Sequence, residues 1–201
     1  MDRRTLIISG CALSLTAGAR SLVPVREPVL GGPCEGCDWV FDGLSPSLSS
    51  RARIAPIDAP GARMTFEGVV TTFRGKPAAN VVVYAYHTDA GGIYPPAANR
   101  HGLLRNWTLT DAQGRYRFDT IRPGAYPGRK VPEHVHMHVI EAGVGTYYID
   151  NLEFLDDPLL TNRSTEGRGG SGLAMPEQRD GVWHARRDIV LGKNIPGYPT
   201  V

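Results

Sequence analysis

From residue 66 onward, the chain alternates between short apolar runs and clusters of turn-forming residues. Helical periodicity is nearly absent, and a short turn around 157–160 is the only exception that we expect. Short strands separated by turns predict an all-β fold, here a two-sheet β-sandwich of the immunoglobulin or prealbumin type. The apolar runs place about seven strands at 68–73, 80–87, 105–110, 115–121, 133–141, 146–154 and 182–191.

Two connections between these runs carry further information. The sequence Asp-Ala-Gln-Gly at 111–114 is a turn signal, so we expect strands 105–110 and 115–121 to pair as a hairpin. The stretch 161–181 contains a glycine-rich segment and is long for a loop in a compact domain. Loops of that length are usually functional lids or mobile segments.

The first 22 residues predict an export signal. Arg3 and Arg4 precede a modest apolar stretch that ends in small residues and is too short to span a bilayer. The adjacent arginines resemble a twin-arginine leader, and Cys11 lies in a lipoprotein-like box that makes a lipid anchor the less favoured alternative. We therefore expect an exported protein, periplasmic or extracellular.

Residues 23–63 are rich in Pro, Ser and Gly and predict an arm that lies on a domain formed by 64–201. The arm contains one C-x-x-C pair, Cys34 and Cys37. A single pair cannot complete a structural zinc site alone, and a thioredoxin-type centre needs a following helix in a βαβ unit. Export favours a structural disulfide that staples the arm, and a redox module built on this pair is an alternative hypothesis.

The composition and the absence of certain motifs argue against several classes of function. The 201 residues suffice for one domain with a real core. The net charge is +2, and no run of Lys and Arg interleaved with aromatics is present, so we expect no nucleic-acid partner. Phosphate-cradling and dinucleotide-binding motifs are absent as well, and we expect no membrane span.

The segment 134–139 holds three of the six histidines: His134, His136 and His138. Alternation along a strand places all three on one face and the apolar residues on the other. Two imidazoles two residues apart can converge on one ion, although a solvated or core strand face is the alternative. At ~3.3 Å per residue, His138 lies roughly 13 Å from His134, so we expect it to be a satisfied neighbour of the site.

Two tyrosines accompany the histidines. Tyr94 follows two glycines in a rigid loop after the predicted strand 80–87, and Tyr126 lies in a Pro/Gly-rich loop just before the histidine strand. Either tyrosine alone is more often an ordinary loop or core aromatic. Their order with the two histidines makes them candidate ligands.

This combination resembles the intradiol ring-cleavage dioxygenases, which include protocatechuate and catechol dioxygenases. The resemblance covers about 66–160, and it rests on the glycine-led Tyr94, the segment 120–124 before Tyr126, the Pro-x-His-x-His at 132–136 and the Asp-Pro at 157–158. It implies that long loops carry a non-haem Fe(III) centre and that no organic cofactor is needed. The iron ligands that the resemblance implies are Tyr94, Tyr126, His134 and His136.

The resemblance also implies the reaction. Catechol-type rings would be cleaved by O₂ between the two hydroxylated carbons to give a muconate-type diacid. Tyr126 and His136 would be axial ligands, and Tyr126 would leave the metal as substrate arrives and accept a proton. The implied partners are a small aromatic diol and O₂, and the family often forms homo-oligomers.

The sequence departs from the family at two places. Val131 stands where characterised members carry an arginine before Pro-x-His-x-His, so Arg122 or Arg129 is predicted to take that catalytic role. The family's Thr-Gln after the histidine strand is replaced by the residues 145–148. These changes motivate an alternative function: an exported β-sandwich module that binds a metal or carbohydrate without catalysis. The arm with its C-x-x-C resembles an exported branch of the family.

Overall fold

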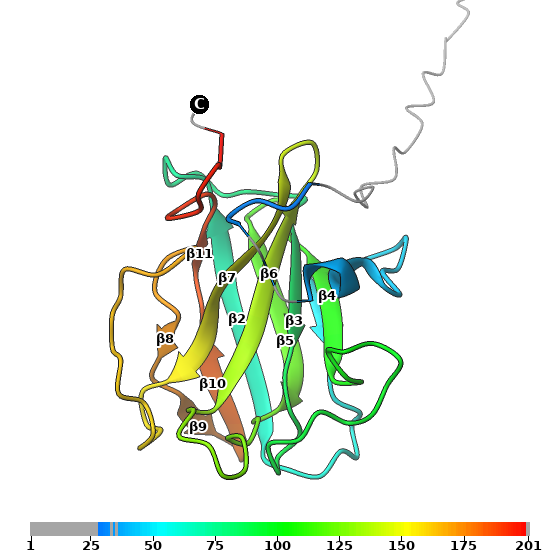
Figure 1. Ribbon diagram of the computed structural model, residues 1–201, viewed down its shortest axis with the longest axis vertical. Coiled ribbons are helices and arrows are strands. Elements are labelled where there is room, and N and C mark those ends of the chain that lie inside the picture. Colours follow the sequence, from blue (N-terminus) through cyan, green and yellow to red (C-terminus); the bar gives the residue numbers. More distant parts are fainter. Residues whose placement is uncertain (1–27, 33, 35, 200–201) are drawn as a thin grey trace, which may run out of the picture.

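The computed structural model describes residues 28–32, 34 and 36–199, so the predicted export signal and Cys11 lie outside the described residues. The described chain is a two-sheet β-sandwich, as predicted (Figure 1). None of its helices is long and apolar enough to cross a membrane. The elements are η1 (Cys37–Phe41), β1 (Arg51–Arg53), β2 (Arg63–Thr71), β3 (Val82–Tyr86), β4 (Arg105–Leu109), β5 (Arg115–Ile121), β6 (His134–Glu141), β7 (Gly145–Phe154), β8 (Leu173–Ala174), β9 (Glu177–Arg179), β10 (Val182–Arg186) and β11 (Ile189–Val190).

The two sheets are built around long antiparallel pairs. One sheet has the order β1-β5-β2-β10-β9, with β11 also pairing β2, and the other has the order β4-β3-β6-β7-β8. In the second sheet, β3, β4, β6 and β7 all pair antiparallel. The histidine strand β6 is therefore an interior strand, held on both sides.

Alternation along the strands creates the core between the sheets. The stacked rings of Phe66 and Phe118, with centroids 5.0 Å apart, come from the first sheet. Val135, Met137 and Val139 of β6 belong to the same cluster and are fully buried. The histidines of β6 therefore lie on the outer face of the second sheet, as the alternation predicted.

The predicted arm covers that outer face. Val40 of η1 is fully buried in a second cluster together with Tyr84 of β3 and Trp107 of β4. Trp107 Nε1 donates a hydrogen bond to the Val40 carbonyl at 2.8 Å. The arm also has regular structure that was not predicted, because β1 adds a parallel strand beside β5.

The predicted hairpin of strands 105–110 and 115–121 is wrong. The turn itself forms, with Asp111 Oδ1 accepting hydrogen bonds from the amides of Gln113 and Arg115 at 2.9 Å each. However, β4 pairs with β3 in one sheet, and β5 pairs with β2 in the other. Each of the two strands has an apolar face that must be buried. Because the strands belong to opposing sheets, both apolar faces pack into the core between the sheets.

The stretch 161–181 is more ordered than a long loop. It contains β8 and β9, and the buried Arg187 guanidinium donates hydrogen bonds to the carbonyls of Arg168 and Gly169. Arg187 and Asp188 separate β10 from β11, which divides the single strand predicted for 182–191.

Candidate metal centre

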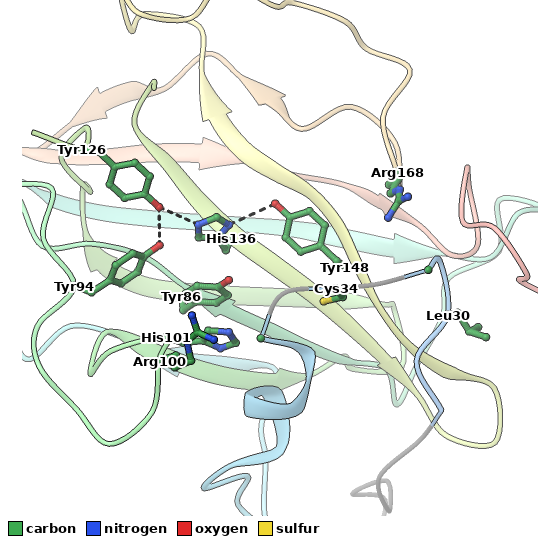
Figure 2. Close-up of a pocket in the computed structure, with 12 residues that line it drawn as sticks. Leu30, Cys34, Tyr86, Tyr94, Arg100, His101, Tyr126, His136, Tyr148 and Arg168 are labelled. Carbon is green, nitrogen blue, oxygen red and sulfur yellow. Dashed lines mark hydrogen bonds between the residues drawn. The ribbon is translucent and has the colours of Figure 1, made fainter. Parts of the chain in front are cut away.

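The structure brings all four predicted ligands together. Tyr94 comes from the β3–β4 loop, Tyr126 from the β5–β6 loop, and His134 and His136 from the start of β6. Tyr126 Oη lies 2.9 Å from Tyr94 Oη and 3.2 Å from the Nε2 atom of each histidine. The two Nε2 atoms are 3.1 Å apart. Figure 2 shows Tyr94, Tyr126 and His136 pointing toward one another.

Hydrogen bonds on the far side of each imidazole fix its tautomer. His134 Nδ1 donates to the Pro132 carbonyl at 2.7 Å. The Tyr148 hydroxyl donates its only proton to Asn151 Oδ1, so its oxygen accepts from His136 Nδ1 at 3.4 Å. Both Nε2 atoms therefore carry lone pairs that face the cluster, the form in which imidazole binds metals.

The donor set fits a metal ion. Two bare Nε2 atoms 3.1 Å apart repel each other unless a proton or cation lies between them, and the Tyr126 hydroxyl has one proton for both. A metal ~2.05 Å from each nitrogen or oxygen would leave neighbouring donors about 2.9–3.4 Å apart. The four distances given above, out of the six between these donor atoms, fall in that range.

Burial sets the protonation of these groups. Burial lowers the pKa of His136 to about 3, and the neighbouring His134 contributes to this shift. Burial also lowers the pKa of His134. Burial, followed by the hydrogen bond with Tyr126, raises the pKa of Tyr94, so this phenol keeps its proton until a cation replaces it. The site thus offers neutral imidazoles and, at Tyr94, a protonated phenol that a metal would ionise.

A close backbone contact holds the two tyrosine loops together. Asp89 Oδ1 accepts hydrogen bonds from the amides of Gly91 and Ile93, which folds the Tyr94 loop into a turn. Gly92 lies at φ 79°, and a Cβ there would be only 1.9 Å from the Ala125 carbonyl oxygen. The glycine before Tyr94 is therefore needed for both its conformation and its contact with the residue preceding Tyr126.

The Asp-Pro motif positions the beginning of β6. Asp157 is 5% exposed, and its Oδ2 accepts the amide hydrogen of Glu133 at 2.6 Å. Its Oδ1 accepts the amide hydrogen of Leu159 at 2.8 Å. The carboxylate therefore ties the chain after β7 to the residue just before His134.

The structure does not bring Arg122 to the ligand cluster. Its guanidinium donates to Glu133 at 2.6 Å and to both oxygens of Asp156 at 2.8 Å, and it lies over the rings of Phe154 and Trp183. These contacts join the ends of β5, β6 and β7, which is a structural arrangement. The catalytic role predicted for Arg122 stays untested, and this position does not favour it.

Arg129 lies near the ring of Tyr126. Its guanidinium carbon is 6.0 Å from the centroid of the Tyr126 ring, and its side chain does not line the cavity described below. Its predicted catalytic role also stays untested.

A cavity of about 450 Å³ opens beside the ligands. Tyr94, Tyr126 and His136 lie at one end, and Leu30 and Arg168 lie toward the other (Figure 2). The remaining lining residues are Gly32, Cys34, Gly36, Tyr86, Arg100, His101 and Tyr148. Residues of the arm thus form one wall of this cavity.

Sequence reasoning missed several residues of this site. The Tyr86 ring stacks on His136 with centroids 4.6 Å apart, and Tyr148 and Asn151 orient the same histidine. Tyr86 is paired with His136 in the β3–β6 register, a signal that the sequence alone does not give. Arg100 and Arg168 are the arginines that line the cavity, rather than the two predicted ones.

The cysteine pair forms the predicted disulfide, Cys34–Cys37. The following element is a five-residue 3-10 helix and not the α-helix of a βαβ unit. The prediction that His138 has satisfied polar atoms is wrong, because its buried Nε2 has no hydrogen-bond partner in the described chain. Its Nδ1 lies 4.0 Å from Cys37 Sγ, a contact that only the arm's fold over β6 creates.

Comparison with known proteins shows which family the sequence resembles. The family model described as "Dioxygenase" matches residues 36–168. The protocatechuate 3,4-dioxygenase beta chain of Burkholderia cepacia is 34% identical over 112 residues, which are 50% of this chain and 48% of that protein. Catechol 1,2-dioxygenase 1 of Acinetobacter lwoffii is 34% identical over 91 residues, which are 43% of this chain and 27% of that protein. The chain therefore matches at most about half the length of these curated relatives.

A solved structure shares the fold. The dioxygenase domain of a dioxygenase carbohydrate-binding protein fusion from Streptomyces sp. SirexAA-E superposes with a TM-score of 0.58 at 23% identity. The match covers 84% of this chain and 98% of that one. The family model spans more than half of the sequence and contains all four converging donors. The chain belongs to the intradiol ring-cleavage dioxygenases.

Proposed function

We propose that this chain is an Fe(III)-dependent enzyme that cleaves a catechol-type ring with O₂ to a muconate-type diacid. One observation carries the proposal: two phenol oxygens and two bare imidazole nitrogens converge at the end of a cavity. Phenolates are hard anionic donors, which suit Fe(III) better than softer metals. When bound, the iron would supply Lewis-acid activation of a coordinated catecholate toward O₂.

Tyr126 is the residue proposed to move a proton. A catechol that binds through both oxygens must lose two protons. Tyr126 Oη lies within hydrogen-bond distance of the other three donor atoms and borders the cavity. As a phenolate it could accept one of these protons from the arriving catechol and become a neutral phenol, and the second proton would pass to water in the cavity. Tyr94, His134 and His136 would be the residues that hold the metal.

The cavity walls support binding of an aromatic ring. The side chains of Tyr86 and Tyr148 border the space next to His136 and present aromatic surface. Arg100 and Arg168 add positive charge to the lining. We therefore propose that catechols with an acidic substituent are preferred over neutral ones. This charge would also attract the anionic product.

Export and assembly belong to the same proposal. The Cys34–Cys37 disulfide supports a location outside the cytoplasm, where disulfides persist. Detection of the protein in a periplasmic or culture fraction, lost on replacing Arg3 and Arg4 with lysines, tests twin-arginine export. Measuring the mass of the protein in solution tests whether it forms a homo-oligomer.

The central experiment combines metal analysis with oxygen uptake. The iron-loaded protein should contain about one iron per chain, absorb visible light through phenolate-to-iron charge transfer, and consume O₂ in step with loss of a catechol ring. Tyr126→Phe should shift the absorption and slow turnover. Tyr198→Phe removes a phenol that hydrogen-bonds Glu141 instead and should leave the spectrum unchanged. Colourless, inactive protein after iron loading would refute the proposal, and coloured protein without O₂ uptake would favour a binding module.

A further inference from the structure

A second group of metal-ligand atoms lies beside the cavity. The sulfur atoms of Cys34 and Cys37 and one ring nitrogen of His138 all lie within 4.8 Å of one another. Cys37 Sγ is 4.0 Å from His138 Nδ1. These atoms come from the arm and from β6, so the fold brings them together across 101 positions of sequence. None of them belongs to the centre formed by Tyr94, Tyr126, His134 and His136.

The disulfide gives the His138 imidazole only a weak hydrogen-bond partner. The side chain is fully buried, and its Nε2 has no hydrogen-bond partner among the described residues. Rings of Tyr84 and Tyr148 pack around it, with centroids 5.8 and 5.1 Å away. Its Nδ1 faces a disulfide sulfur, which is a weak acceptor. A buried imidazole normally has stronger partners, so this arrangement points to a ligand that the oxidised pair does not hold.

The neighbouring His101 shows the same deficiency. It is 4% exposed, its Nδ1 is bonded to Tyr84 Oη at 2.9 Å, and its Nε2 has no partner in the described chain. That Nε2 lies against Gly36, where a Cβ would approach it to 2.3 Å. Gly36 lies between the two cysteines at φ 83°, so the C-x-x-C turn passes directly over this nitrogen.

The spacing of these groups suits a tetrahedral ion after reduction. In a zinc site with sulfur ~2.3 Å and nitrogen ~2.05 Å from the metal, donors lie about 3.5–3.8 Å apart. The cysteine sulfurs are bonded in the oxidised chain and need to separate by about 2 Å to reach that spacing. The distance from Cys37 Sγ to His138 Nδ1 is already close to it. A C-x-x-C pair is also a spacing that structural zinc sites use.

We propose that reduction of the Cys34–Cys37 disulfide creates a site for a thiophilic divalent metal such as Zn²⁺, held by both sulfurs and His138 Nδ1. In the reduction, the S–S bond takes up two electrons and two protons, and a phosphine reductant takes oxygen from water to become its oxide. The metal then displaces the two thiol protons. Cys34 lines the cavity, which gives the reductant a path. The site is independent of the proposed catalytic function.

Cobalt is the probe for this site. Co²⁺ bound by thiolate shows a sulfur-to-metal charge-transfer absorption, which the tyrosine and histidine centre cannot produce because it contains no sulfur. The full chain should carry Cys11→Ser, since Cys11 would add a thiol. After reduction by a phosphine and its removal without oxygen, Co²⁺ titration should give the sulfur band at about one equivalent per chain. The oxidised chain should give no such band.

Two variants make the test specific. His138→Gln should weaken Co²⁺ binding at the sulfur site by roughly ten-fold or more. Tyr126→Phe, which alters the other centre, should leave the band and its affinity unchanged. Absence of the band in the reduced chain, or equal affinity in His138→Gln, would overturn the proposal. If His138→Gln does not fold, X-ray absorption of the Zn²⁺-loaded reduced parent tests the proposal instead. The proposed site requires two sulfur ligands and at least one nitrogen ligand around zinc. A coordination shell without sulfur would contradict the site.

Discussion

Tyr148 decides which nitrogen of His136 is available to a metal. Its hydroxyl proton goes to Asn151 Oδ1, so its oxygen accepts from His136 Nδ1 and leaves Nε2 bare. Tyr148→Phe removes that acceptor, and we expect iron affinity to fall by roughly 10–100-fold, as for other partners of metal-bound histidines. Competition with a chelator measures this change. Tyr198→Phe loses a hydroxyl far from the ligands and is the matched control. Equal affinities of the two variants would contradict the role of Tyr148.

His87 predicts how stability depends on pH. Its Nδ1 donates to the Thr88 carbonyl and its Nε2 accepts from Thr120 Oγ1, so the buried ring is neutral. Burial lowers its pKa from 6.5 to about 4. The unfolded chain therefore binds a proton between pH 6.5 and 4 that the folded chain excludes, and stability is complete above pH 6.5 and declines as the pH falls through that window.

The test compares the parent with His87→Gln, which cannot titrate. Between pH 7 and pH 5 the parent should lose about 2 kcal/mol more unfolding free energy than the variant, because a group with pKa values of about 6.5 and 4 in the two states contributes that difference. Urea denaturation at both pH values gives the comparison. Parallel losses in the two proteins would show that His87 does not cause the acid sensitivity.

The sequence could identify ligands but not the groups that orient them. Tyr94, Tyr126, His134 and His136 have residue types and an order that are specific to one kind of chemistry. Arg122 could not be assigned in the same way, because its partners Glu133 and Asp156 are met only after β5, β6 and β7 are brought together. Likewise, the sequence could not show that His138 Nε2 lacks a hydrogen-bond partner among the described residues, because the surroundings of His138 depend on how the arm folds over β6.

At the scale of elements, the two tyrosine loops act as one unit through Gly92. Gly92→Ala would place a Cβ 1.9 Å from the Ala125 carbonyl oxygen, so the loops carrying Tyr94 and Tyr126 must separate. We expect weaker iron binding and a loss of stability of about 2–3 kcal/mol from clash and backbone strain together. Iron titration and chemical denaturation measure the two effects.

The matched control for this change is Gly75→Ala. Gly75 has nearly the same backbone angle, φ 76°, but nothing lies within 4 Å of the added Cβ. It should show only the strain, about 1–2 kcal/mol, and unchanged iron affinity. If both variants bind iron like the parent, the contact between the loops does not position the ligands.

The wrong hairpin shows what local sequence signals omit. The residues 111–114 form the turn that their sequence predicts, and both flanking strands exist at nearly the predicted bounds. The turn does not determine which sheet each strand joins. That choice depends on the partners Val82 for Leu109 and Phe66 for Phe118, which lie far away in sequence, and on the shared core that a sandwich creates.

At the scale of the whole molecule, the arm turns a sheet surface into a cavity. Residues 28–44 have little periodicity, so the sequence predicted that they lie on the domain and contain a disulfide, but not which face they cover. In the structure, η1 buries Val40 against Trp107, and Leu30 and Cys34 line the space in front of the ligands. The outer face of β6 would otherwise be open to water, and its histidines would be solvated.

A metal in this centre should stabilise the entire fold. Its donors belong to two loops and one strand, spread over 43 positions from Tyr94 to His136, so the unfolded chain cannot present them together. Ligand binding to the folded state alone adds about 2.7 kcal/mol at a free ligand concentration 100 times the Kd. A change of 1 kcal/mol shifts Tm by roughly 2–4 °C in a domain of this size.

Removing iron by chelation should therefore lower Tm by roughly 5–10 °C while the far-UV circular dichroism stays that of a β protein. In Tyr126→Phe the iron-dependent shift should be several degrees smaller, because one donor is lost. Replacing both Cys34 and Cys37 with serine should leave the shift intact, since the disulfide holds the arm and not the four ligands. A parent whose Tm does not respond to chelation, or a Tyr126→Phe variant with the full shift, would mean that Tyr126 and its three neighbours do not hold the ion.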